Sequence, residues 1–167
     1  VSRNQARFIK PLVRRNLMAG KSPDLAMKNF SNLKAVVISA SWHPEICQSL
    51  INGAVRGFEK SGITNVEVRK VSGSFELPLA AQLALDSGFD VAVVVGLVLR
   101  GETPHFDYVC QGVTAGIMDV SLSRSKPIGF GVLMCDTIEQ ANARAGFADS
   151  FEDKGFDSAI AALSVLN

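Results

Sequence analysis

The residue types that build disulfides and metal sites are scarce in this chain of 167 residues. It contains three cysteines, two histidines, one tryptophan and one tyrosine. Cys47, Cys110 and Cys135 are odd in number and lie far apart in apolar or helical surroundings, so the sequence predicts neither a disulfide framework nor a zinc site. We therefore expect no metal, and a reducing compartment, the cytoplasm, as the location.

The sequence also lacks any continuous apolar run of the roughly 20 residues that span a bilayer. No apolar run follows the N-terminal charges in the way a secretory signal requires. We expect a soluble protein that has no membrane partner. Hydrophobic residues nevertheless make up 47% of the chain, which is enough for one domain of this length to bury a core.

Positive charge is concentrated in the N-terminal part of the chain. The whole chain has a net charge of +1, but residues 1–34 contain eight Lys or Arg against Asp24 alone, a net charge of +7, so the rest carries −6. We interpret residues 1–32 as a basic extension ahead of a domain at 33–167. The extension is predicted to be a solvated or partly helical leader. Docking to an acidic partner, nucleic acid or a membrane surface is the alternative, and an organellar transit role has little support.

Strands and helices are predicted to alternate along the domain. Apolar and β-branched runs predict strands at 35–40, 66–71, 91–99 and 128–134. Apolar residues at helical spacing, with suitable start and stop residues, predict helices from Pro44 to Gly62 and at 77–86, 106–123, 137–145 and 154–166. Strands that alternate with helices indicate an α/β fold, a three-layer α/β/α sandwich around a four-stranded parallel sheet.

Several polar and aromatic residues follow the strands, where ligands bind in such sheets. Taken singly, each has an ordinary explanation. A lone tryptophan such as Trp42 is usually partly buried filler, and a lone histidine such as His105 is usually a hydrogen-bonded structural residue. Phe130 alone would be core, and Glu76 alone would be a partner of a helix dipole. Four loops are expected to converge at one sheet edge, and this convergence predicts a binding site; they carry Trp42 with His43, Phe75 with Glu76, residues 101–105, and the residues after Met134.

Four segments together resemble the 6,7-dimethyl-8-ribityllumazine synthase family. They are Ser-Trp-His at 41–43, Gly-Ser-Phe-Glu-Leu-Pro at 73–78, Arg-Gly-Glu-Thr-Pro-His-Phe-Asp-Tyr-Val at 100–109, and Thr-Ile-Glu-Gln-Ala-Asn-Ala-Arg-Ala-Gly at 137–146. The resemblance covers residues 33–167 and implies a flavodoxin-like fold. It also implies condensation of 5-amino-6-(D-ribitylamino)pyrimidine-2,4-dione with 3,4-dihydroxy-2-butanone 4-phosphate, releasing phosphate and water, without a cofactor.

The resemblance assigns roles to individual positions. It places His105 at proton transfer, for which an imidazole near neutral pH is suited, with Asp107 expected to orient it. The residues implied against the pyrimidine and ribityl groups are Trp42, His43, Ser74, Phe75, Glu76, Val98, Leu99 and Phe130. Those implied against the phosphate are Gly101, Glu102, Thr103 and Arg144, with Lys154 nearby. Most relatives have Phe where Trp42 stands, and the indole predicts measurable flavin affinity.

The resemblance further implies a homo-oligomer whose sites are shared between subunits. Phe130, Arg144 and Lys154 would complete a pocket begun by another chain. The loop at 146–155 is longer than in shell-forming relatives, so we expect a pentamer, with an icosahedral 60-mer shell as the alternative. Two small-molecule substrates and riboflavin synthase, as pathway partner, are implied. The competing interpretation is a non-catalytic flavin-binding or shell-forming protein on the same scaffold.

Overall fold

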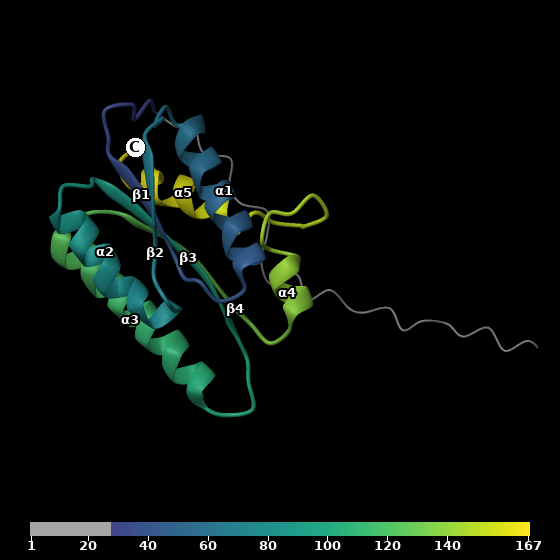
Figure 1. The fold of residues 1–167 in the computed structure, drawn as a ribbon. Helices are drawn as coiled ribbons and strands as arrows, with labels where there is room; N and C mark the ends of the chain where they lie inside the picture. The colour runs from purple at the N-terminus through teal and green to yellow at the C-terminus, as the bar shows by residue number, and fades with distance from the viewer. Residues whose placement is uncertain (1–27) are drawn as a thin grey trace, which may run out of the picture.

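The computed structural model describes residues 28–167, drawn in colour in Figure 1. Most of the expected basic extension therefore lies outside the described residues. The last part of that segment packs on the domain: Phe30 is buried in the core, and its backbone N–H donates to the Ser61 carbonyl at 2.9 Å. The folded unit thus includes residues ahead of position 33.

A four-stranded parallel sheet forms the centre, as predicted. Its strands are β1 (Ala35–Ser39), β2 (Val66–Lys70), β3 (Val91–Leu99) and β4 (Ile128–Cys135), in the order β2-β1-β3-β4. β3 pairs with both β1 and β4, and its first seven residues are buried. Such two-sided burial is why its sequence is an almost unbroken apolar run.

Helices cover both faces of the sheet, which makes the predicted three layers (Figure 1). One face carries α1 (Pro44–Lys60), α4 (Ile138–Asn142) and α5 (Lys154–Ser164), and the other carries the short helix η1 (Ser74–Glu76), α2 (Leu77–Asp86) and α3 (His105–Arg124). Successive residues of β1 point to opposite faces of the sheet. Val37 packs against the layer of α1 and α5, and Val36 packs against the layer of α2 and α3. Among residues 28–167, no helix combines the length and apolarity needed to cross a membrane.

Helix α4 is shorter than the predicted 137–145. The Thr137 hydroxyl caps its start by accepting from the Gln140 backbone N–H at 3.3 Å. The helix ends where residues 151–153 pair with the chain that follows it. The Phe151 N–H donates to the Ala143 carbonyl at 2.9 Å, and Ala145 forms an antiparallel bridge with Asp153. Backbone groups that would have continued the helix are satisfied by this pairing with residues 151–153. Arg144 consequently lies beyond the helix.

Candidate functional site

The carboxyl ends of β1 and β3 open into a cavity of about 960 Å³. Nine of the expected site residues line it: Trp42, His43, Ser74, Phe75, Glu76, Val98, Leu99, Gly101 and His105. The lining also includes residues that the sequence analysis did not select, namely Ser72, Gly73, Leu97, Arg100, Tyr108 and Val109. Tyr108 could have been selected from the sequence, because it lies one helical turn from His105. In the structure its side chain is 70% exposed.

The Trp42–His43 corner is held in a strained conformation. His43 has φ 57° and ψ 67°, the left-handed region, which costs a non-glycine residue roughly 1–2 kcal/mol. Cys47 supports the corner from the first turn of α1: its N–H donates to the His43 carbonyl at 3.0 Å and its thiol to the Trp42 carbonyl at 3.1 Å. Burial raises the pKa of the Cys47 thiol, so this donor stays protonated. The indole of Trp42 is left 69% exposed at the cavity.

The turn at residues 73–76 lies close to the Trp42 indole, because an added Cβ at Gly73 would lie 3.8 Å from it. The Glu76 carboxylate accepts from the Gly73 N–H at 2.9 Å, which fixes the turn. The buried Ser74 hydroxyl has no hydrogen-bond partner within residues 28–167. It lies against Gly96 of β3, where an added Cβ would approach its oxygen to 2.9 Å. An unpaired buried hydroxyl is costly.

His105 begins α3, directly after the loop that leaves β3. Its imidazole is exposed and makes no hydrogen bond to any described residue. The expected contact from Asp107 is not formed. Instead the Asp107 carboxylate lies 3.3 Å from a guanidinium nitrogen of Arg100, whose Nε donates to Asp136 at 2.6 Å. The hydrogen bond to Asp136 is the main cause that raises the pKa of Arg100, and it ties the loop after β3 to the loop after β4.

The remaining expected site residues separate into two groups. Glu102 and Thr103 are exposed on the loop ahead of α3 and do not line the cavity. That loop leads into the N-terminus of a 20-residue helix, where unpaired N–H groups and the helix dipole favour an anion. Phe130, Arg144 and Lys154 lie elsewhere, around β4.

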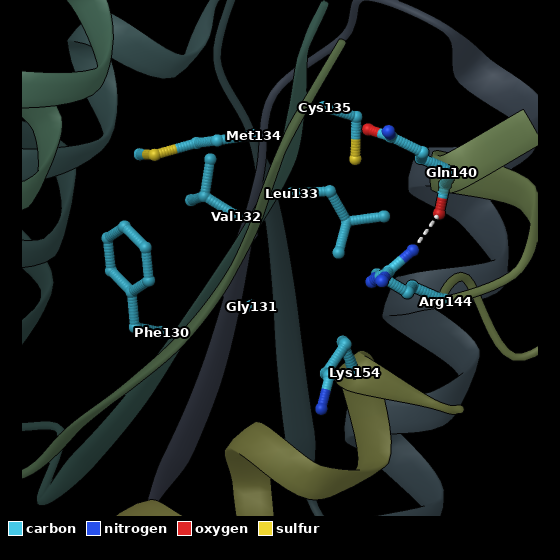
Figure 2. Close-up of a pocket in the computed structure, with 9 residues that line it drawn as sticks. All are labelled: Phe130, Gly131, Val132, Leu133, Met134, Cys135, Gln140, Arg144 and Lys154. Atoms are coloured by element: carbon cyan, nitrogen blue, oxygen red, sulfur yellow. Dashed lines mark hydrogen bonds between the residues drawn. The ribbon is translucent and has the colours of Figure 1, made fainter. Parts of the chain in front are cut away.

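A second cavity of about 350 Å³ runs along β4 (Figure 2). Its lining comprises Phe130, Gly131, Val132, Leu133, Met134, Cys135, Gln140, Arg144 and Lys154. Figure 2 shows the Phe130 ring on one side of the strand and the Arg144 and Lys154 side chains on the other. The Arg144 guanidinium donates to the Gln140 carbonyl at 2.9 Å. Burial raises the pKa of the Cys135 thiol, which disfavours the nucleophilic thiolate.

The position of Lys154 is set by the packing of α5 on α1. Asp153 caps α5 by accepting from the Phe156 N–H at 3.0 Å, and it also accepts from Arg56 of α1 at 2.6 Å. At Gly155 an added Cβ would overlap the Leu50 carbonyl of α1. This close approach requires glycine, and it holds the first turn of α5 beside β4.

The two cavities share no lining residue. The first contains an exposed indole and an imidazole, and the second contains two cations and an exposed aromatic ring. β4, which borders the second cavity, is an edge strand that pairs only with β3. Within residues 28–167, no group of three or more His, Cys, Asp or Glu side chains could hold a metal ion.

Comparison with known proteins shows one consistent similarity. A family profile described as 6,7-dimethyl-8-ribityllumazine synthase matches residues 32–167. A protein of that name from Streptomyces coelicolor is 47% identical over 148 residues, which cover 88% of this chain and 92% of the relative. Another, from Cutibacterium acnes, is 45% identical over 152 residues, 91% of each chain. A third, from Paenarthrobacter aurescens, is 49% identical over 134 residues, 80% of this chain and 83% of the relative.

Proposed function

The chain belongs to the 6,7-dimethyl-8-ribityllumazine synthase family, and we propose that it makes this lumazine in riboflavin biosynthesis. It is an enzyme, a transferase. It condenses 5-amino-6-(D-ribitylamino)pyrimidine-2,4-dione with 3,4-dihydroxy-2-butanone 4-phosphate and releases phosphate and water. The observation that carries this function is the first cavity, which assembles nine separately expected residues at one sheet edge.

The first cavity suits the pyrimidinedione and its ribityl chain. The exposed Trp42 indole offers a flat π surface on which a heterocycle can stack. A polyol needs several convergent donors and acceptors, and His43, Ser74 and the Glu76 carboxylate, which is fixed by the Gly73 N–H, belong to residues that line the same space. Val98 and Leu99, which are partly buried, add apolar surface to the lining.

His105 is assigned to proton transfer. Imine formation between the amine and the ketone, elimination of phosphate and closure of the ring all move protons, and an imidazole can give and take them near neutral pH. The His105 imidazole is exposed at the cavity and is not engaged by any described side chain, so it can face the reacting atoms. Much of the acceleration comes from holding two substrates in register, because an amine and a ketone react without help.

The phosphate of the butanone is assigned to Arg144, with Lys154 beside it. A guanidinium can grip two phosphate oxygens in a planar fork. The backbone at Gly101, Glu102 and Thr103, ahead of the N-terminus of α3, is assigned to the same phosphate. The Glu102 side chain is expected to point away from the anion, because two negative charges in contact repel each other.

Because the two groups of residues lie in separate cavities, we propose that a site is completed between subunits. Phe130, Arg144 and Lys154 at the β4 edge of one protomer would face Trp42, Glu76 and His105 of a neighbour. We expect a homopentamer, in which each protomer supplies both halves to different sites. The three cysteine side chains are unpaired, which supports a reducing, cytoplasmic location. Riboflavin synthase, which would consume the product, is the expected pathway partner.

Turnover of the two substrates, followed by the absorbance of the lumazine product, tests the function. The wild-type protein is expected to turn over both. His105→Gln is expected to slow turnover by tens-fold to about 10⁴-fold while substrate binding is retained, because positioning survives and proton transfer does not. Asp119→Asn, a change on the exposed part of α3 outside both cavities, is the matched control. No turnover by the wild-type protein would refute the proposal.

A further inference from the structure

A carboxylate lies behind the two cations of the second cavity. One Glu152 oxygen, Oε2, is 3.1 Å from the Lys154 ammonium nitrogen and 3.8 Å from Arg144 Nε. This oxygen is buried and has no partner in hydrogen-bonding geometry within residues 28–167, so both contacts are ion pairs without a directed hydrogen bond. Glu152 does not line the cavity, whereas Arg144 and Lys154 do.

The backbone holds Glu152 in this place from both sides. Its N–H donates to the Ala143 carbonyl at 3.1 Å, and its carbonyl accepts from the Gly146 N–H at 3.1 Å. The Lys154 N–H in turn donates to the Arg144 carbonyl at 3.0 Å. The three charged residues therefore belong to one small antiparallel pairing, which fixes the backbone from which the Glu152 carboxylate reaches both cations.

We propose that Glu152 is a built-in counter-ion that limits how tightly Arg144 and Lys154 hold phosphate. This inference rests on the proposed function, in which these two cations bind the phosphate of the butanone and inorganic phosphate is a product. Without the carboxylate, two adjacent positive charges would face the cavity and retain the product anion. With it, the positive charge of the pair is partly offset, and phosphate can leave after each turnover.

The direction of the effect follows from the charges. Lys154 has a second acidic neighbour, Asp157 of α5, at 3.5 Å, and of the two cations this carboxylate pairs with the lysine. Glu152 is the carboxylate that contacts both cations of the described second cavity. Its Oε2 oxygen is buried although the side chain as a whole is 20% exposed, so the charge is less screened by water than that of a fully exposed group. Removing its charge while keeping its shape is expected to tighten phosphate binding about three- to tenfold.

The test is calorimetric titration of inorganic phosphate into the assembled full-length wild-type protein and Glu152→Gln. Gln keeps the side-chain length and removes the charge. The phosphate Kd is expected to fall about three- to tenfold in Glu152→Gln, while the Kd for the pyrimidinedione does not change. Glu59→Gln removes the same charge from an exposed position at the end of α1, away from β4, and is expected to leave both constants unchanged.

Each outcome separates the two proposals. Wild-type binding with an equal or weaker phosphate affinity in Glu152→Gln would overturn the counter-ion role and leave the proposed function standing. No phosphate binding by the wild-type protein would refute the phosphate site and this inference together. Should Glu152→Gln fail to fold, Glu152→Asp is the second variant. Its shorter side chain moves the carboxylate away from Arg144 and Lys154, so phosphate binding is expected to tighten by a smaller factor. An unchanged or larger phosphate Kd in Glu152→Asp would also contradict the counter-ion role.

Discussion

At the scale of single residues, the site contains conformations and groups that the fold alone does not favour. His43 occupies the left-handed region without being glycine, and the buried Ser74 hydroxyl has no described partner. Strain and unsatisfied polar groups collect where a binding site dictates the geometry. Both residues line the first cavity, and their cost is offset by packing elsewhere in the domain.

Arg144→Lys is the prediction that belongs to this scale. Lysine keeps the positive charge but loses the planar fork, so the affinity for the butanone phosphate is expected to fall about tenfold, with little change for the pyrimidinedione. Binding of each substrate measured separately gives both constants. Arg69→Lys, on β2 at the opposite edge of the sheet, is the matched control. An equal loss for both substrates would contradict the assignment of Arg144 to phosphate.

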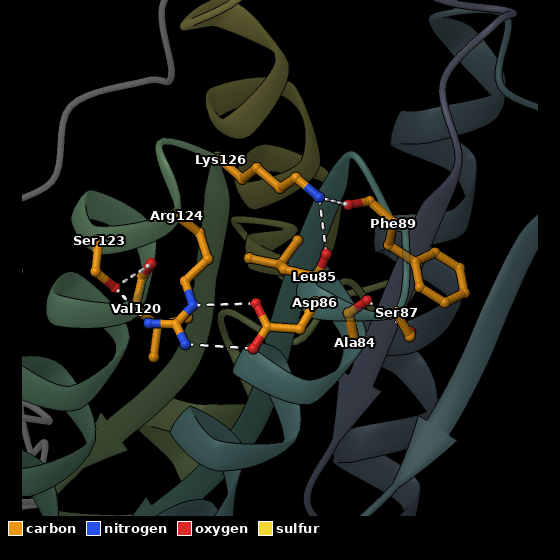
Figure 3. A network of polar contacts seen from close by, with 9 residues as sticks. All are labelled: Ala84, Leu85, Asp86, Ser87, Phe89, Val120, Ser123, Arg124 and Lys126. Carbon is orange, nitrogen blue, oxygen red and sulfur yellow. Dashed lines mark hydrogen bonds and ion pairs between the residues drawn. The ribbon is translucent and has the colours of Figure 1, made fainter.

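At the scale of elements, polar contacts join the C-terminal end of α2 to the end of α3 and the residues that follow it (Figure 3). Arg124 and Lys126 make these contacts. Lys126 donates to the carbonyls of Leu85 and Phe89, both at 2.7 Å, at the C-terminal end of α2. Arg124 pairs there with Asp86, and this hydrogen bond is the main cause that lowers the pKa of Asp86. A cation at a helix C-terminus satisfies carbonyls that have no partner in the helix.

Lys126→Met tests the contribution of this contact to stability. Met fills similar space but leaves two carbonyls without their charged donor, so the free energy of unfolding is expected to fall by about 1–2 kcal/mol. Denaturant unfolding of the variant measures the loss. Lys70→Met, at an exposed position on β2, is the control and is expected to change stability little. Turnover near 25 °C should be unchanged, because Lys126 lines neither described cavity.

At the scale of the whole molecule, the arrangement of the two cavities bears on assembly. Exposed apolar side chains run along the outer surfaces of α2 and α3, including Leu79, Leu83, Met118 and Leu122. Apolar surface of this kind is typical of interaction sites. Together with the open edge at β4, it supports the proposal that neighbouring protomers join two half-sites.

Mixed assembly tests a shared site directly. Protomers with His105→Gln lack the first half, and protomers with Arg144→Gln lack the second. If each site draws its halves from different protomers, random co-assembly of equal amounts restores about a quarter of the sites to wild type. Turnover of the refolded mixture is expected to exceed that of either variant alone. A mixture of His105→Gln with Glu76→Gln, both in the first cavity, is the control and is expected to show no gain in turnover. A gain in turnover in this control, or no gain in the test mixture, would contradict the shared site.

The sequence by itself predicted the strands and most helices, because local apolar periodicity encodes which faces are buried. The interior run at 91–99 became β3 with the predicted bounds, and Leu77–Asp86 became α2. Nine residues of the first cavity could also be predicted, because parallel strands deliver their following loops to one edge. Their assignment to a reaction came from the family resemblance.

Other features were decided only by the tertiary structure. Helix α4 ends early because residues eight or nine positions further along the chain pair with the backbone at its end, and apolar periodicity does not predict such pairing. The separation of Arg144 from Trp42 into different cavities depends on the position of β4 at the sheet edge, which strand patterns do not specify. The approach of Glu152 to both cations is likewise a product of the loop closing on itself. Local sequence determines which surfaces are buried, whereas contacts between distant segments determine which charges meet.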